Sequence, residues 1–256
     1  METLPTFIVT GATQGIGRAV ATALSARGRA VVAVGRSQER LASLQAQCGP
    51  RLTALGADLS TAAGVERVAA CLPPAVEVAG IVHAAGSLVP LEPYERIDPD
   101  ALAEHFRIHV GAPIALYQAL SRDHAIRRMA FVDSYSASAV RIGWSAYSIV
   151  KAGAQMAARC AREELARTRS FRVFPGAVNT QIVATVLASQ TETAAAFAGI
   201  IERGELAEPD EAAGFIVWLL LDAPDDLLSS RDAFDYNNPA DRGLSSQPHP
   251  PGKPDA

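Results

Sequence analysis

The sequence predicts an α/β fold, a doubly wound parallel sheet of about seven strands with helices on both faces. Two observations predict it: short apolar runs alternate with longer helical patterns, and a glycine-rich turn joins the first run to the first helix. Repeated β-α-β order implies parallel strands, because each helix returns the chain to the same end of the sheet. At 256 residues, 49% of them hydrophobic, the chain can bury one large core, so we expect a single domain.

The strand-like segments are short and either apolar or rich in β-branched residues. They cover residues 7–10, 30–34, 51–55, 78–82, 130–133, 171–174 and 233–236. The first helical pattern follows the glycine turn and stops at Arg27-Gly28; the others cover residues 37–47, 61–72, 99–120, 144–167 and 209–221. Gly111 and Pro113 predict an irregularity inside the helix over 99–120.

The turn after the first strand has the composition of a nucleotide-binding loop, with glycines at positions 11, 15 and 17. Three glycines let the backbone turn sharply and approach a pyrophosphate without a Cβ clash, and the following helix offers unpaired N–H groups to the phosphates. Ligands of such sheets bind at the carboxyl ends of the strands, which is where this turn lies. We therefore expect a nucleotide site here.

Composition limits the partners of the chain. A net charge of −4 and a pI near 5.8 lack the basic footprint of a nucleic-acid binder, and no Lys/Arg run suggests a membrane surface. Cys48, Cys71 and Cys160 are odd in number and widely spaced, which argues against a disulfide framework or a zinc site. No signal peptide precedes the first strand, and no apolar run reaches the length of a membrane span. We expect a cytoplasmic protein without a metal.

The candidate catalytic residues are a tyrosine and a lysine four positions apart. Tyr147 and Lys151 lie on one face of the helix over 144–167, so the phenol and the ammonium project side by side. A nearby cation favours the phenolate, so we expect Lys151 to lower the pKa of Tyr147 and make it a general acid/base. Ser134 ends the preceding strand, from which its hydroxyl can point into the same crevice.

Together these motifs resemble the short-chain dehydrogenase/reductase family over roughly residues 6–238. Thr10 through Gly17 is similar to TGxxxGxG, Asp58-Leu59 to the pair that contacts the adenine, and Tyr147 with Lys151 to YxxxK; residues 175–180 are similar to the segment that borders the nicotinamide. The resemblance implies a Rossmann-type domain in which Ser134 orients a substrate carbonyl, Tyr147 transfers the proton, and Lys151 holds the nicotinamide ribose. By the same resemblance the cofactor contacts are Gly11, Thr13, Gln14, Gly15, Ile16, Gly17, Asp58, Leu59, Ala84, Ala85, Gly86, Tyr147, Lys151, Pro175, Gly176, Val178 and Thr180.

Two positions depart from the family pattern. The fourth strand usually ends in Asn-Asn-Ala-Gly, whereas here it reads His83-Ala84-Ala85-Gly86, and we interpret His83 as structural. The long helix over 99–120 normally carries an asparagine that binds a water of the proton relay, and His109 stands at that place. Either His109 takes over the relay through a ring nitrogen, or it only packs.

The end of the second strand predicts the cofactor. An NAD site places an acid there to accept from the ribose 2′-OH, but this chain has Gly35 followed by Arg36 and Ser37. Arg36 can pair with a 2′-phosphate and Ser37 can donate a hydrogen bond to it, so we expect NADP. Gln14 does not support the assignment of NADP, because many NADP-binding relatives carry a basic residue in the glycine turn.

Residues 181–206 carry few charges and many apolar side chains, and are expected to form a substrate lid, within a domain over 1–244 that is followed by a disordered tail over 245–256. Residues 177–181 and 235–238 are most similar to the sepiapterin reductase and benzil reductase group. The acid that anchors a pterin in sepiapterin-type enzymes aligns with Asn238, which weakens a pterin substrate.

We therefore expect an NADPH-dependent reductase that converts a ketone or diketone to a secondary alcohol. Two alternatives stay open: an NADP⁺-linked alcohol dehydrogenase working in the oxidative direction, and a non-catalytic NADP-sensing protein on the same fold. The helices over 99–120 and 144–167 carry small residues that suit close pairing between subunits, so we expect a homodimer or homotetramer.

Overall fold

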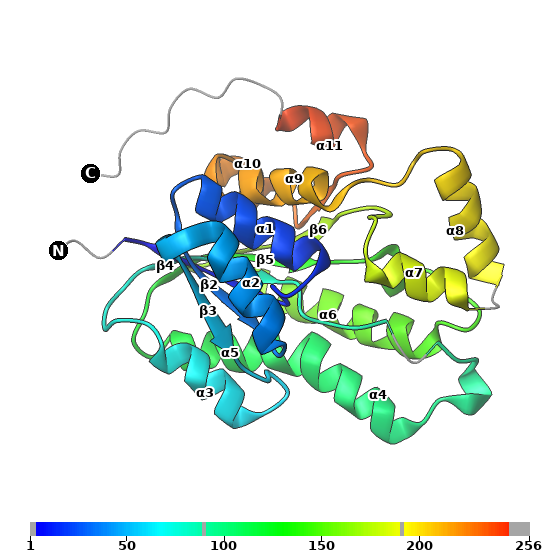
Figure 1. Cartoon of the computed structure of the whole chain (residues 1–256), viewed down its shortest axis with the longest axis horizontal. Coiled ribbons are helices and arrows are strands. Elements are labelled where there is room, and N and C mark those ends of the chain that lie inside the picture. The colour runs from blue at the N-terminus through cyan, green and yellow to red at the C-terminus, as the bar shows by residue number, and fades with distance from the viewer. Residues whose placement is uncertain (1–3, 89–90, 190–191, 246–256) are drawn as a thin grey trace.

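A computed structural model of the protein describes residues 4–88, 91–189 and 192–245. The seven strands in these ranges form one parallel sheet in the order β3-β2-β1-β4-β5-β6-β7, which confirms the predicted doubly wound architecture (Figure 1). The strands are β1 (Thr6–Thr10), β2 (Ala30–Gly35), β3 (Leu52–Gly56), β4 (Val78–His83), β5 (Ile126–Val132), β6 (Arg169–Phe174) and β7 (Ala233–Asp235).

Helices cover both faces of the sheet (Figure 1). The helices are α1 (Gly15–Ala26), α2 (Gln38–Cys48), α3 (Ala62–Ala70), α4 (Pro99–Phe106), α5 (Ala112–Leu120), α6 (Ser145–Glu164), α7 (Gln181–Ala188), α8 (Glu192–Glu202), α9 (Pro209–Leu221), α10 (Asp225–Ser230) and α11 (Pro239–Leu244). Single turns of 3₁₀ helix lie at Gly49–Arg51, Tyr94–Arg96 and Tyr135–Ala137. None of the helices in the described ranges is long and apolar enough to cross a membrane.

The alternation of side chains along β1 explains why both faces need a cover. Phe7 and Val9 join the core beneath α1, α2 and α9, whereas Ile8 between them joins the core beneath α3, α5 and α6. A strand that is buried on both faces has a continuous apolar sequence, and this pattern predicts β1. Because helices cover both faces of the sheet, a binding site can form at the carboxyl ends of the strands.

The predicted irregularity lies in the helix that faces this edge. α4 and α5 are joined through a wider π turn at Arg107–Gly111. Pro113 has no N–H to donate to the carbonyl of His109, so the ordinary α-helical hydrogen bond cannot form at this place. As a result His109 lies on a widened turn and is buried.

Element ends differ from the prediction in a few places. β5 begins at Ile126 rather than 130, and α10 and α11 were not predicted, because six-residue helices are too short to show a periodicity. Most of the predicted tail, residues 246–256, lies outside the described residues.

Candidate active site

One cleft of about 650 Å³ opens at the carboxyl ends of the strands. Every predicted site residue lines it except Ser37, which accepts a hydrogen bond from the N–H of Arg40 (3.4 Å) and caps α2 instead. The topology is the cause: β1 and β4 are neighbours at the centre of the sheet, so the glycine turn meets the Ala84–Gly86 segment there.

The glycine turn is held against the end of β4 by one hydroxyl. Thr10 Oγ1 accepts hydrogen bonds from the N–H groups of Ala84 and Ala85, both at 3.1 Å, and donates to the carbonyl of Val82. Gly11 has a φ of +67°, and a Cβ there would lie 2.7 Å from the carbonyl oxygen of Ala84. Only glycine fits this turn.

The entrance to α1 fits a dinucleotide phosphate. Gln14 stands at the N-cap but its side chain does not cap the helix, so N–H groups of the first turn face the cleft. Gly15 has a φ of +54°, and Thr180 lies opposite it, 3.2 Å from where a Cβ would be. A side chain at position 15 would fill the cradle that the phosphate needs.

At the end of β2 two arginines approach the cleft. Arg36 lines it with an exposed side chain, and its charge, together with larger contributions from hydrogen bonds of Ser60, lowers the pKa of Asp58. The guanidinium of Arg40, in the first turn of α2, donates a hydrogen bond to the side-chain oxygen of Gln14. Residues 11–17 contain no basic residue, but Arg40 of α2 places a guanidinium against this turn.

Ser134, Tyr147 and Lys151 meet at the carboxyl end of β5. Tyr147 and Ser134 line the same cleft, where the Ser134 hydroxyl acts to lower the pKa of Tyr147, and the Ser134 oxygen accepts from the N–H of Ser136 at 3.2 Å. Lys151 is buried, and its ammonium donates to the carbonyl of Val132 at 2.6 Å. The structure therefore brings the three predicted catalytic side chains together.

The expected effect on the pKa of Tyr147 is wrong. Burial is the largest influence, the Ser134 hydroxyl partly opposes it, the negative charge of Asp133 adds to it, and together they raise this pKa to about 12. The ammonium of Lys151 is directed at the Val132 carbonyl instead. At neutral pH Tyr147 is thus a protonated phenol, the form that donates a proton.

His109 is close to the reacting groups but uncharged. Its ring lies edge-on to Tyr147, with centroids 6.0 Å apart, and its Nε2 lies 3.3 and 3.2 Å from the N–H and carbonyl of Ser87. Burial, the charge of Lys151 and the neighbouring His105 lower its pKa to about 3, although the hydrogen bond with Ser87 raises it. Any proton that His109 passes must therefore move through the neutral ring.

Comparison with known proteins agrees with this geometry. A family model described as short chain dehydrogenase matches residues 5–191. The chain belongs to this family. Family members use nicotinamide cofactors and act on small-molecule carbonyl substrates or the corresponding alcohols.

Two curated relatives are carbonyl reductases. Benzil reductase ((S)-benzoin forming) of Bacillus cereus is 25% identical over 83% of this chain and 92% of its own length. L-Xylulose reductase of Homo sapiens is 29% identical over 84% of this chain and 88% of its own. A short chain dehydrogenases/reductase structure from Saccharomyces cerevisiae matches with a TM-score of 0.82 at 23% identity, covering 92% of this chain and 97% of that one.

In this member of the family an aromatic wall adjoins Tyr147. Trp144 lies edge-on to Tyr147 at 5.9 Å and is stacked on Phe197 of α8 at 6.0 Å. Leu88 and Val186 are buried against the same cluster. The segment predicted as a lid therefore forms one apolar side of the cleft.

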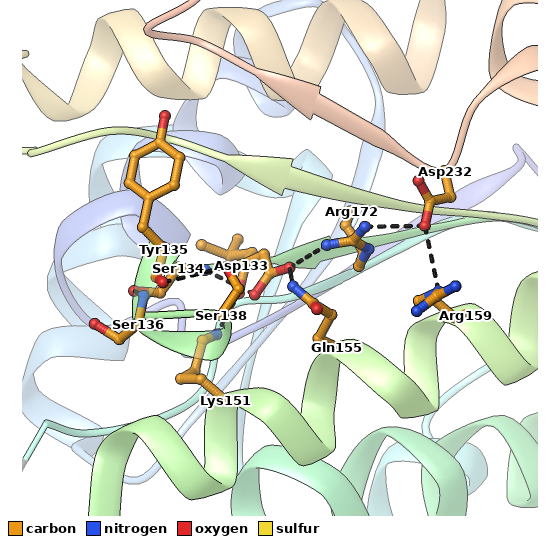
Figure 2. Close-up of polar contacts among 11 residues, drawn as sticks. Asp133, Ser134, Tyr135, Ser136, Ser138, Lys151, Gln155, Arg159, Arg172 and Asp232 are labelled. Carbon is orange, nitrogen blue, oxygen red and sulfur yellow. Dashed lines mark hydrogen bonds and ion pairs between the residues drawn. The ribbon is translucent and has the colours of Figure 1, made fainter. Parts of the chain in front are cut away.

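The sequence interpretation missed three residues of the site. Arg40 and Trp144 were not singled out, although each lies within four residues of a predicted position. Asp133 was assigned only to a strand end, yet its buried carboxylate lies directly beneath Ser134 (Figure 2). Asn238, which stands where sepiapterin-type enzymes have their pterin-anchoring acid, caps α11, and Asn237 lines the cleft.

His83 also lines the cleft, as a buried histidine. His83 is buried at the cleft floor against Phe131, with ring centroids 4.6 Å apart, and burial lowers its pKa to about 3. Across the described ranges no three His, Cys, Asp or Glu side chains lie close enough to hold a metal ion.

Proposed function

We propose that the protein is an NADPH-dependent reductase that converts a ketone or diketone to a secondary alcohol. The observation that carries this proposal is that Ser134, Tyr147 and Lys151 line the same cleft as the glycine turn. A positioned acid beside a nucleotide cradle is what carbonyl reduction needs.

The side chains divide the work of proton transfer and orientation. A bound nicotinamide cofactor supplies the hydride. Ser134 donates a hydrogen bond to the substrate carbonyl, and Tyr147 gives its proton to the oxygen as the alcohol forms. Lys151 holds the ribose side of the cofactor. Because burial raises the pKa of Tyr147 to about 12, the tyrosine holds its proton at neutral pH and can give it to the carbonyl oxygen.

The preference for NADPH rests on the two arginines at the end of β2. A 2′-phosphate would gain charge-assisted hydrogen bonds from Arg36 and Arg40, whereas a free ribose hydroxyl would not. An acid at position 35 would favour NADH, but a Cβ there would lie 2.4 Å from the methyl group of Thr13. The end of β2 therefore suits NADPH in shape as well as in charge.

The apolar wall indicates the kind of ketone. Trp144, Phe197 and Leu88 offer flat and aliphatic surface next to Tyr147. Such a wall suits a carbonyl flanked by an aromatic ring, as in benzil, better than a polyhydroxylated ketose. The relative that is named as a benzil reductase supports the same choice.

The assay follows loss of reduced cofactor with benzil and with L-xylulose, each with NADPH and with NADH. We expect turnover of benzil with NADPH to exceed the other three combinations, and Tyr147→Phe to abolish it. Tight NADPH binding with no turnover of either ketone, or of a wider ketone panel, would favour the non-catalytic sensor. Faster oxidation of the alcohol benzoin with NADP⁺ than reduction of benzil at neutral pH would favour the dehydrogenase.

We also infer a homodimer or homotetramer. Phe106, Ile149 and Met156 are exposed to between 40% and 55% and belong to α4 and α6. Phe106 lies over Gly153, 3.0 Å from where a Cβ would be, so these apolar side chains lie on adjoining helices. Light scattering should show a multiple of 26.9 kDa, and Met156→Glu should lower it.

A further inference from the structure

A buried carboxylate lies beneath the catalytic residues. The side chain of Asp133 is 2% exposed. Its Oδ1 accepts from the N–H of Ser134 at 2.7 Å, and its Oδ2 accepts from Arg172 at 2.8 Å and from Gln155 at 3.2 Å (Figure 2). Asp133 thus bonds directly to the backbone that presents the Ser134 hydroxyl.

The ion pairs continue from Asp133 toward the surface. Arg172 also pairs with Asp232 at 2.9 Å, and Asp232, which is 36% exposed, pairs with Arg159 at 3.7 Å (Figure 2). A buried ion pair is weak evidence for stability, because desolvation can cost more than the attraction returns. The position of Asp133 beside the catalytic groups therefore points to a role in the chemistry.

Besides Arg172, the charge of Asp133 acts on Lys151. Its ammonium is buried and donates to the carbonyl of Val132, the residue before Asp133. A buried lysine tends to lose its proton, and a nearby carboxylate opposes that loss. Here burial lowers the pKa of Lys151 and the charge of Asp133 raises it.

We propose that Asp133 is a positioning residue of this active site: its carboxylate keeps Lys151 in the ammonium form and fixes the backbone of Ser134. The proposal rests on the proposed function, since it assigns Asp133 to the same Ser-Tyr-Lys chemistry. It also explains why an acid occupies a buried place next to a serine whose hydroxyl must stay oriented.

The groups that face Lys151 are few. They are Asp133 at the end of β5, Tyr147 on the same helix, His109 on the π turn, and Arg172 of β6 behind Asp133. His109 is neutral above about pH 3, and Tyr147 is neutral up to about pH 12. Asp133 is therefore the acid whose charge raises the pKa of Lys151.

The composition of the chain allows a direct measurement. The sequence has two lysines, Lys151 and Lys253, against 21 arginines. Protein made with ¹³Cε-lysine gives two lysine signals, which Lys253→Arg assigns. We expect the titration midpoint of Lys151 to fall by about 1–3 pH units in Asp133→Asn, because an opposite charge at close range shifts a pKa by that amount.

Asp232→Asn is the matched control. It also removes an acid from Arg172 but leaves the charge next to Lys151, so the Lys151 midpoint should stay within a few tenths of a pH unit. An equal fall in both variants, or no fall in Asp133→Asn, would overturn the proposal.

A second variant separates charge from folding. Asp133→Asn with Arg172→Leu removes both members of the buried pair, so Arg172 is not left in the interior without its Asp133 partner. We expect it to unfold near the wild-type temperature but to keep the lowered midpoint of Lys151. If both properties return to wild-type values, Asp133 serves only to pair with Arg172, and the proposal fails.

The kinetic arm uses benzil and NADPH. For Asp133→Asn we expect the alkaline limb of kcat/KM to move to lower pH, because Lys151 loses its proton earlier, and kcat at pH 7 to fall about tenfold or more, because Ser134 is less well oriented. An inactive wild type would count against the proposed function alone, since the lysine titration does not depend on turnover.

Discussion

Arg40 of α2 donates a hydrogen bond to the side chain of Gln14 in the glycine turn. The turn itself has no basic residue, yet a guanidinium lies against it. Arg36 lies between the end of β2 and the start of α2, whereas Arg40 lies in the first turn of α2. Arg36 lines the cleft and Arg40 contacts the glycine turn, and the proposed preference for NADPH rests on these two cations.

Removal of either arginine should weaken NADPH binding selectively. A charge-assisted hydrogen bond is worth about 1.5–3 kcal/mol, so we expect Arg36→Ala and Arg40→Ala each to lower NADPH affinity roughly ten- to a hundredfold and to leave NADH affinity unchanged. Fluorescence titration measures both. Arg29→Ala is the control, because Arg29 is exposed at the other end of β2. Equal losses for the two cofactors would mean that neither arginine reads the phosphate.

Inversion of the preference should need three substitutions. Gly35→Asp with Arg36→Ala supplies a carboxylate for the ribose hydroxyl, but its Cβ would meet Thr13 Cγ2 at 2.4 Å. We expect this variant to bind both cofactors poorly. Adding Thr13→Ala removes the methyl group and should restore NADH binding while NADPH stays weak, as measured by the same titration. Good NADH binding without the Thr13 change would show that the strand end can move.

Tyr147 and Lys151 should differ in the kinetic constants that they change. Tyr147→Phe removes the acid, so kcat should fall roughly 10²–10⁴-fold with NADPH affinity kept. Lys151→Ala should weaken NADPH binding and also slow turnover, because the lysine both holds the ribose and adjusts the site. Steady-state kinetics with circular dichroism as the folding check decides this; a folded Tyr147→Phe with normal turnover would remove Tyr147 from the mechanism.

Substitution of His109 should distinguish a relay from packing. His109→Asn restores the residue that the family resemblance leads us to expect, so turnover should persist. His109→Leu cannot exchange a proton and should slow turnover most at high pH, where proton resupply limits. A flat ratio of the Leu variant to wild type across the pH range would leave His109 with a packing role against Gly86, whose added Cβ would lie 2.3 Å from the ring.

The buried histidines should make the fold sensitive to acid. The pKa values of His83 and His109 fall from 6.5 to about 3 in the folded protein, so the unfolded chain binds more protons between these limits. Their contribution is complete above pH 6.5 and is lost as the pH falls toward 3. The free energy of unfolding should lose up to about 1.4 kcal/mol per pH unit for each histidine. In His83→Asn the free energy of unfolding, measured with urea between pH 6.5 and 5, should fall less steeply with falling pH than in the wild type. An unchanged pH dependence would contradict the lowered pKa of His83.

Local patterns predicted the strands well, and they predicted side chains that the structure places in one cleft. Apolar runs mark strands buried on both faces, and the spacing of Tyr147 and Lys151 places them on one helical face. The patterns could not predict which way a side chain points or which elements lie side by side. Ser37 has the chemistry for a phosphate contact or for a helix cap, and it caps α2. Arg40 contacts the glycine turn because α2 lies beside this turn, which the sequence pattern does not show.

The sequence also could not predict how deeply the titratable groups Tyr147 and Asp133 are buried. The distance from Tyr147 to Lys151 along the helix predicted a lowered pKa, but desolvation dominates and raises it. Asp133 was equally hidden, because a carboxylate at a strand end usually faces water, and here Arg172 from the neighbouring strand β6 allows it to be buried.

The stack of Trp144 on Phe197 gives the enzyme its own optical reporter. The chain has two tryptophans, and the other, Trp218, belongs to α9 and is buried in the core. In Trp218→Phe the remaining emission would come from a ring that contacts both Tyr147 and α8. Displacement of α8 during turnover would thus change fluorescence at the reacting centre, so the timing of substrate entry and product departure could be followed without any added dye.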